Sequence, residues 1–216
     1  MKETANLRYT ALKSKESNKH ESKKYDLSKL RKEISKVQDN KRFEHTLSVA
    51  YTAANLAACH GADIEHALIA GILHDCAKCL SDEKLLSICE EHHLQTSREE
   101  RQKPSLLHAK VGSYLAEKKY HVENPDILNA IRNHTTGRPD MSLLEKIVFV
   151  ADYMEPGRRQ APRLEQIRRT AFADLNQAVL MILEDTLEYL RGSDTVIDQT
   201  TQETYDYYKT AYLSRW

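Results

Sequence analysis

The segment Ala67-Leu-Ile-Ala-Gly-Ile-Leu-His-Asp75 combines an apolar helical pattern with two residue types that bind metals. His74 follows Ala70 by four residues and Ala67 by seven, so a helix would place these three residues on one face. A buried imidazole or carboxylate costs free energy unless it is hydrogen-bonded, paired or bound to a cation. The segment therefore predicts a core helix whose end carries two polar groups that need partners.

Apolar residues keep the spacing of helices on both sides of this segment. No long run alternates with a period of two, and glycine is scarce, with 6 residues in 216. Both observations predict an all-α fold without internal repeats. Together with the polar residues discussed below, they predict a helical bundle with a metal centre in its core. We expect helices over about 27–37, 41–60, 67–73, 82–89, 104–115, 125–131, 142–153, 163–191 and 205–213.

Composition narrows the class of protein. Lysine plus arginine and aspartate plus glutamate both number 32, so no net charge favours nucleic acid or a membrane surface. We expect a cytoplasmic protein, because no apolar run is long enough for a signal peptide or a membrane span. Residues 1–25 form a lysine-rich extension without an apolar period, and residues 26–216 are expected to form one domain.

Four cysteines suit a reducing compartment better than a disulfide scaffold. The Cys76-Ala-Lys-Cys79 pair has the spacing of a redox motif or of half a zinc site. Cys59 and Cys89 do not supply the second pair that a zinc ribbon needs. We therefore expect Cys76 and Cys79 to pack beside the His-Asp pair.

Six residues of metal-binding types, four histidines and two aspartates, lie on the apolar side, or at the end, of five different predicted helices. A single histidine on an apolar face is more often a satisfied core residue than a ligand. Six such groups from separate helices could instead meet at one centre, where a cation would offset the cost of burying all of them. Imidazole nitrogen and carboxylate oxygen suit iron, manganese or zinc. The candidate ligands are His45, His74, Asp75, His108, His134 and Asp152.

Three stretches carry a family resemblance. They are Arg42-Phe-Glu-His-Thr-Leu-Ser-Val49, Ala70-Gly-Ile-Leu-His-Asp-Cys-Ala-Lys78 and Ile147-Val-Phe-Val-Ala-Asp-Tyr-Met-Glu-Pro-Gly-Arg158. They resemble the HD superfamily of metal-dependent phosphohydrolases and, more narrowly, its YqeK family, the symmetrical diadenosine tetraphosphate hydrolases of bacteria. Segments 133–137 and 196–201 are similar to that family as well. The resemblance covers about residues 26–212, and the 151–158 run is its most specific part.

The resemblance implies a centre of two divalent or trivalent metal ions, iron in the first place, with manganese or zinc as alternatives. His45, His74 and Asp152 would bind one metal, His108 and His134 the other, and Asp75 would bridge them. A hydroxide that bridges the metals would attack an inner phosphate of diadenosine tetraphosphate and yield two ADP.

Further residues are candidates for contact with the phosphates. Lys78 lies one helical turn after Asp75, which would place it near the metal face, so we interpret it as a contact to phosphate. We assign catalytic roles to Asp75 and Lys78, and the alternative for Lys78 is an exposed lysine. Arg158 and Arg159 follow the Pro-Gly break after the last candidate ligand, and arginine suits bidentate contact with phosphate. Thr135 is the remaining candidate, and it could also simply close the helix after a ligand.

Other interpretations stay open from the sequence. Within the enzymes, the alternative is an HD phosphohydrolase that acts on a nucleoside monophosphate, a deoxynucleoside triphosphate or an alarmone. Outside the enzymes, the alternative is a protein that senses nucleotides without hydrolysing them. Glu155 would orient water or pair with an arginine. The residues Tyr205, Tyr207, Tyr208, Tyr212 and Trp216 are expected to pack a last helix, with adenine stacking or a homodimer surface as alternatives.

Overall fold

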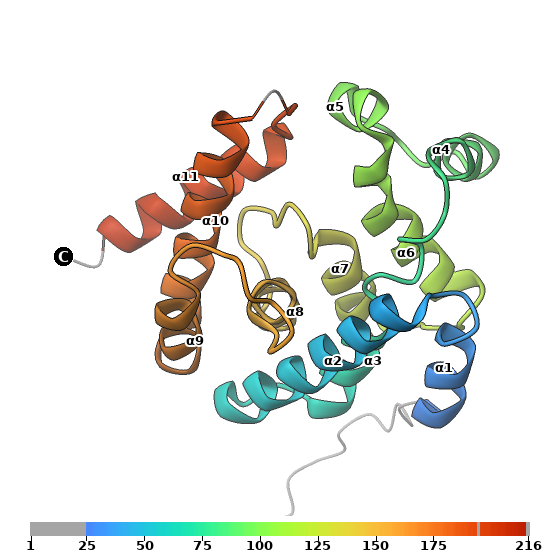
Figure 1. The fold of residues 1–216 in the computed structure, drawn as a ribbon, viewed down its shortest axis with the longest axis horizontal. Helices are drawn as coiled ribbons and strands as arrows, with labels where there is room; N and C mark the ends of the chain where they lie inside the picture. The colour runs from blue at the N-terminus through green and yellow to red at the C-terminus, as the bar shows by residue number, and fades with distance from the viewer. Residues whose placement is uncertain (1–24, 194, 215–216) are drawn as a thin grey trace, which may run out of the picture.

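The computed structural model describes residues 25–193 and 195–214, so the lysine-rich extension (except Tyr25) and Trp216 lie outside the described residues. Within the described part, eleven α-helices and one 3₁₀ helix occur without any strand, which confirms the all-α prediction (Figure 1). They are α1 (Leu27–Ile34), α2 (Asn40–His60), α3 (Ile64–Leu73), α4 (Asp82–Glu91), α5 (Arg98–Gln102), η1 (Pro104–Leu106), α6 (Leu107–Lys118), α7 (Pro125–Asn133), α8 (Leu143–Met154), α9 (Leu164–Ala173), α10 (Leu175–Arg191) and α11 (Gln199–Leu213).

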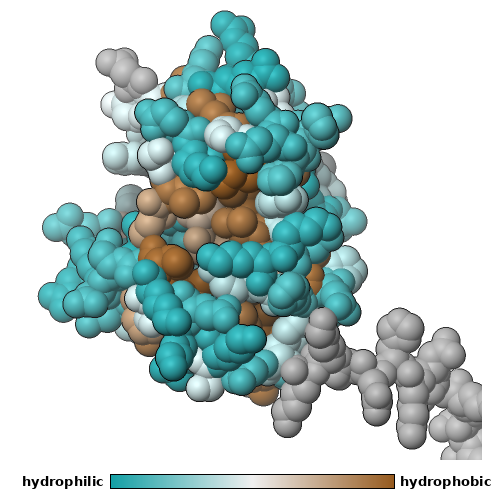
Figure 2. Space-filling view, turned by 90° about the vertical axis from the view of Figure 1, so that its right-hand side faces the viewer, coloured by the Kyte–Doolittle hydropathy of each residue, from teal (hydrophilic) through white to brown (hydrophobic). Residues whose placement is uncertain are grey.

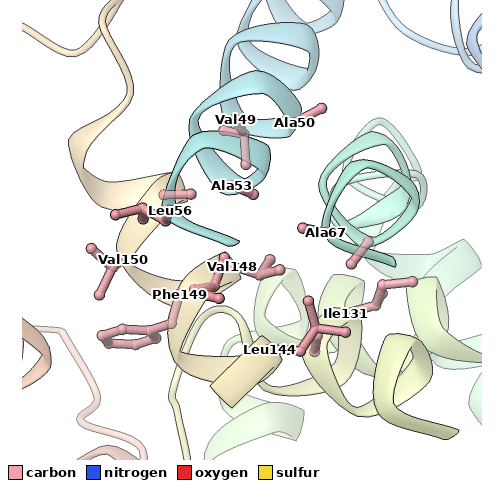
Figure 3. Close-up of a cluster of buried hydrophobic side chains, with 14 of the residues drawn as sticks. Val49, Ala50, Ala53, Leu56, Ala67, Ile131, Leu144, Val148, Phe149 and Val150 are labelled. Atoms are coloured by element: carbon pink, nitrogen blue, oxygen red, sulfur yellow. The ribbon is translucent and has the colours of Figure 1, made fainter. Parts of the chain in front are cut away.

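The core forms where α2, α3, α7 and α8 pack against one another (Figure 3). Val49 and Leu56 of α2 meet Val148 of α8, and Ile131 of α7 lies beside Ala67 of α3. All five side chains are fully buried. Burial of a valine, leucine or isoleucine side chain stabilises a fold by about 1.5–3 kcal/mol, so this layer holds the four helices in place.

Small residues let α2 and α3 approach closely. A Cβ atom added at Gly71 would lie 2.5 Å from Cα of Ala50 and 3.1 Å from its Cβ. Only glycine leaves room for this contact between helix backbones. The contact fixes the C-terminal end of α3, where the His-Asp pair stands, against the first half of α2.

Capping residues begin or end several of the helices that carry the candidate ligands. Asp63 caps α3 and accepts a hydrogen bond from the backbone N–H of His66. Ser142 and Glu145 form a capping box at the start of α8. Gly61 ends α2 with a φ of +74°, a conformation that favours glycine. Capping of this kind contributes about 1 kcal/mol per helix and fixes where each helix starts.

Several boundaries differ from the prediction. The single helix expected over 163–191 is two helices, because Asp174 adopts an extended conformation and caps α10 through the backbone N–H of Gln177. The first helix ends at Ile34, and Val37 is 40% exposed. The last helix begins at Gln199, six residues earlier than expected, and α5 has no predicted counterpart.

One face of the molecule is mostly hydrophilic (Figure 2). Figure 2 shows hydrophilic side chains over most of one face, with an apolar area in its middle. A small second core lies near this side of the molecule, where α4 packs against η1 and α6. Among the described helices, none combines the length and the apolar character that crossing a membrane requires.

Candidate metal centre

The structure brings all six predicted ligands together. His45 comes from α2, His108 from α6 and Asp152 from α8. His74 and Asp75 follow the end of α3, and His134 follows the end of α7. The side chains of His74, Asp75, His108 and His134 are buried, and those of His45 and Asp152 are partly exposed, at 17% and 24%. Residues separated by as many as 107 positions thus form one polar cluster inside an apolar core.

Asp75 lies at the centre of this cluster, and its two carboxylate oxygens face different imidazoles. Oδ1 lies 3.4 Å from Nε2 of His108 and 3.5 Å from Nε2 of His134. Oδ2 lies 3.6 Å from Nε2 of His74 and 3.9 Å from Nε2 of His45. One carboxylate therefore stands between two pairs of imidazoles.

Asp152 completes one side of the cluster. Its Oδ1 lies 3.1 Å from Nε2 of His45 and 4.0 Å from Nε2 of His74. These three residues offer ligand atoms within 4.8 Å of one another, and so do His74, Asp75 and His134. The two overlapping groups could each hold a metal ion.

Three of the four histidines are oriented by the backbone of the preceding turn. In each, Nδ1 lies 2.6–2.7 Å from the backbone carbonyl oxygen three residues earlier. Because a carbonyl only accepts, Nδ1 must carry the hydrogen, and Nε2 keeps a free lone pair that faces the cluster. The pairs are His74 with Gly71, His108 with Ser105, and His134 with Ile131.

His45 is oriented by a side chain instead. Its Nδ1 lies 3.3 Å from Oε1 of Glu155, which is 4% exposed and also accepts a hydrogen bond from the backbone N–H of Gly157. A carboxylate behind an imidazole fixes the ring and raises its basicity as a ligand. Glu155 thus contacts a candidate ligand, which is neither of the two roles considered from the sequence.

The residues fit a bound metal. Nε2 of His74 is buried without a hydrogen-bond partner, and Nε2 of His108 lies 3.2 Å from Nε2 of His134, although both atoms have lone pairs in the tautomers above. Burial of such acceptors against one another is unfavourable, and a cation between them removes the cost. Imidazole and carboxylate donors suit iron, manganese or zinc.

The protonation states of His74, His108 and Asp75 favour metal binding as well, whereas at His45 and His134 burial is outweighed by the nearby carboxylates, which raise the pKa of both imidazoles. Burial, together with the nearby His134 and Lys78, lowers the pKa of His108 to about 3, and burial also lowers the pKa of His74. Burial opposes ionisation of Asp75, but the surrounding histidines hold its pKa well below the usual range. Two neutral imidazoles and an ionised carboxylate are thus present near neutral pH, the forms that bind metals.

Of the four residues predicted to contact phosphate, three lie at the cluster and one lies away from it. Nζ of Lys78 lies 3.4 Å from both ring nitrogens of His108, and Oγ1 of Thr135 lies 3.3 Å from Nε2 of the same ring. Arg158 donates to the backbone carbonyl of Asp152 at 3.1 Å. Arg159 is exposed and lines a separate cavity formed by residues 156–169.

Comparison with known proteins decides the family. The family model of the HD domain matches residues 42–157, more than half of the chain. The chain belongs to the HD-domain family. The matched region contains all six candidate ligands of the HD domain, from α2 to α8.

Two relatives indicate which type of HD-domain protein this chain is similar to. A protein of Bacillus subtilis named bis(5'-nucleosyl)-tetraphosphatase, symmetrical, is 40% identical over 77% of this chain and 88% of its own length. One of the same name from Halalkalibacterium halodurans is 41% identical over 76% and 87%. These matches confirm the resemblance to the YqeK type.

A solved structure has the same fold. It is that of a protein from Clostridium acetobutylicum named as a predicted HD superfamily hydrolase involved in NAD metabolism. The sequence identity is 38%, the TM-score is 0.83, and the match covers 87% of this chain and 98% of that one. The helical arrangement of this HD domain is therefore shared with a known protein over nearly its full length.

Sequence reasoning assigned no role to Arg42, which the HD domain places at the cluster. Its Nη1 donates to Oδ2 of Asp75 at 2.7 Å. Gln38 donates to the backbone carbonyl of Asp75 at 3.1 Å and accepts from Thr46. The spacing of Arg42, three residues before His45 on one helix face, is the signal that could have identified it.

A second residue that sequence reasoning missed holds the turn after α8. Arg168 of α9 donates from Nε to the carbonyl of Met154, and from Nη2 to the carbonyls of Glu155 and Arg158, at 2.9–3.0 Å. These hydrogen bonds hold the backbone from which Arg158 extends, and the position of its long side chain depends on that backbone. No pattern in the sequence connects position 168 with this turn.

The packing prediction is confirmed for Cys76 and is wrong for Cys79. Cys76 is buried and donates to the carbonyl of Gly112, whereas Cys79 is exposed, and neither forms a disulfide. Burial raises the pKa of the Cys76 thiol to about 12, so this sulfur is neither a redox thiolate nor a ready metal ligand.

Proposed function

We propose that this protein is a metal-dependent bis(5'-nucleosyl)-tetraphosphatase that hydrolyses diadenosine tetraphosphate and related dinucleoside polyphosphates symmetrically. One water is consumed, and each molecule of diadenosine tetraphosphate gives two ADP. The observation that carries the proposal is the cluster of four imidazoles whose free Nε2 atoms face Asp75 and Asp152. It occurs in a chain that is about 40% identical to relatives named for this activity.

The proposed metal ligands follow the geometry of the cluster. His45, His74 and Asp152 would hold one ion, and His108 and His134 a second ion. Asp75 would bridge them, since its two oxygens face the two groups. Iron is our first assignment, with manganese or zinc as alternatives. When bound, such ions polarise phosphoryl oxygens and lower the pKa of water.

Cationic side chains around the cluster would bind the polyphosphate. Lys78 stands against the ring of His108, and Arg158 reaches towards Asp152. Arg42 forms an ion pair with Asp75 and also lines a cavity of about 660 Å³ beside His45. Metal ions at Asp75 would release this guanidinium for phosphate. Arginine suits that contact because its planar fork matches two phosphate oxygens.

A product assay tests the function directly. Purified protein supplied with manganese or iron should convert diadenosine tetraphosphate to ADP alone. An Asp75→Asn variant should lose at least about 100-fold in activity, since even residues that only orient metal ligands change activity by about 10–100-fold. The matched control is Asp206→Asn, on the exposed face of α11.

The outcomes separate the competing functions. Equal amounts of AMP and ATP would contradict symmetrical cleavage. Turnover restricted to a nucleoside monophosphate, a deoxynucleoside triphosphate or an alarmone would support another HD phosphohydrolase. Tight binding of nucleotide without turnover would support a sensor. An Asp75→Asn variant with full activity would contradict the proposed centre.

The proposed enzyme domain extends beyond the matched region to residues 26–216. Tyr208 of α11 supports this extent, because its hydroxyl accepts a hydrogen bond from the backbone N–H of Met141, just before α8. We also propose that the protein acts in the cytoplasm, where its four free thiols would persist.

A further inference from the structure

A second cavity, of about 440 Å³, adjoins the half of the cluster that His108 and His134 form. Thr135 joins the two features, because it lines the cavity and its Oγ1 lies 3.2 Å from Nε2 of His134. Ala109 and Asn133, the chain neighbours of the two histidines, also line it. The cavity is therefore beside the candidate metal centre.

Segments far apart in the sequence form this cavity. Residues 95–100 lead into and begin α5, residues 132–136 end α7, and Asp198 and Thr200 stand at the start of α11. The 196–201 segment received no role from the sequence. Its place beside Thr135 connects it with the chemistry of the cluster.

The chemistry of the lining is polar but nearly balanced in charge. Lys110, a partly buried cation, is paired with Glu100 at 2.6 Å. Arg132 is exposed, and the buried carboxylate of Asp198 accepts from the backbone N–H of Thr200. Hydroxyl and amide groups make up most of the remainder. Such a lining matches the ribose hydroxyls and the base edges of a nucleoside better than a chain of phosphates.

The larger cavity on the other half of the cluster has a different lining. It includes His45 together with the cations Lys41, Arg42 and Arg158. The two cavities share no lining residue. Both volumes lie within the range of about 300–1,000 Å³ that is usual for small-molecule sites.

We propose that the second cavity binds one of the two nucleosides of a dinucleoside polyphosphate, while the larger cavity binds the other. This inference rests on the proposed function. The tetraphosphate would then cross the cluster from His45 to His134, with its middle at Asp75. Water adds to one inner phosphate and ADP leaves, so the products are equal because the two nucleosides are held on either side of the cluster.

A variant that fills the cavity tests the proposal. Thr200→Phe places a ring in the lining, and Thr210→Phe is the control at an exposed position of the same helix. The substrates are diadenosine tetraphosphate and adenosine tetraphosphate, which has a single nucleoside. We expect Thr200→Phe to lower kcat/KM for the first substrate by about tenfold or more, the size of discrimination that a shaped pocket achieves. The second substrate should change by less than about threefold, because its nucleoside can use the larger cavity.

Binding of the product gives a readout without turnover. Calorimetry with the metal-loaded protein should find two ADP molecules per wild-type chain and one per Thr200→Phe chain. Asp198→Asn, which keeps a side chain able to cap α11, should raise KM for diadenosine tetraphosphate and lower the affinity of one ADP site.

Two results would overturn the proposal: equal loss with both substrates, or a single ADP per wild-type chain. Failure of the proposed function has a different signature, since the wild-type protein would then give no ADP from diadenosine tetraphosphate. The ADP stoichiometry would still decide whether the second cavity binds a nucleotide.

Discussion

Replacement of Gly71 by alanine tests whether the contact between α2 and α3 determines both stability and the metal centre. The added Cβ would lie 2.5 Å from Cα of Ala50, whereas carbon atoms normally pack at about 3.5–4.0 Å. The helices must therefore separate locally by roughly 1 Å. Overpacking costs about 1–3 kcal/mol, and contact with backbone rather than a flexible side chain favours the upper value.

Alanine also improves helix propensity by about 1 kcal/mol over glycine, which leaves a net loss of about 2 kcal/mol. For a chain of this length, each kcal/mol corresponds to a Tm change of about 2–4 °C, so we expect a fall of about 4–8 °C. Metal affinity should fall too, because the carbonyl of Gly71 orients the ring of His74.

Thermal unfolding in the presence of a chelator measures the stability, and manganese titration measures the affinity. Gly192→Ala is the control, because its nearest atoms would lie at 3.6 Å and its φ is negative. That variant should stay within about 0.5 kcal/mol of wild type. If Gly71→Ala matched wild type in both measurements, the close approach of the helices would not be what positions His74.

Three further predictions concern the surroundings of the cluster. Glu155→Gln removes the carboxylate behind His45 and should lower metal affinity or activity by about 10–100-fold, and an unchanged metal titration would contradict this. Arg168→Lys loses the fork that holds the turn before Arg158 and should raise KM severalfold, while Arg169→Lys, on an exposed neighbour, should not. Thiol reagent at pH 8 should modify the exposed cysteines quickly and the buried ones only after denaturation, and fast reaction of all four would refute the described burial. The exposed pair is Cys59 and Cys79, and the buried pair is Cys76 and Cys89.

The fold and the set of candidate ligands could be predicted because each depends on local spacing. Apolar periodicity identifies helices, and the positions of His74 and Asp75 at the end of an apolar run mark them as inward-facing. The break at Asp174 could not be predicted this way, since the pattern of apolar residues continues through it. There a single side-chain cap determines the boundary between two helices.

Contacts made by long side chains were the other part that the sequence did not reveal. Arg42 has the spacing of a site residue, but its ion pair with Asp75 depends on how α2 packs against α3. Arg168 is further removed, because its three acceptors are backbone carbonyls that leave no trace in residue identity. Arg159 has the right residue type and neighbourhood in sequence, but its side chain is exposed.

The way in which the four imidazoles are oriented has a consequence for how the centre can evolve. Three of them are fixed by main-chain carbonyls, which every amino acid provides, so substitutions that leave the backbone in place keep their tautomers intact. His45 alone depends on a replaceable partner, Glu155. Variation among descendants that changes metal preference or activity, while all six ligands are retained, should therefore concentrate at that partner and at the turn that carries it.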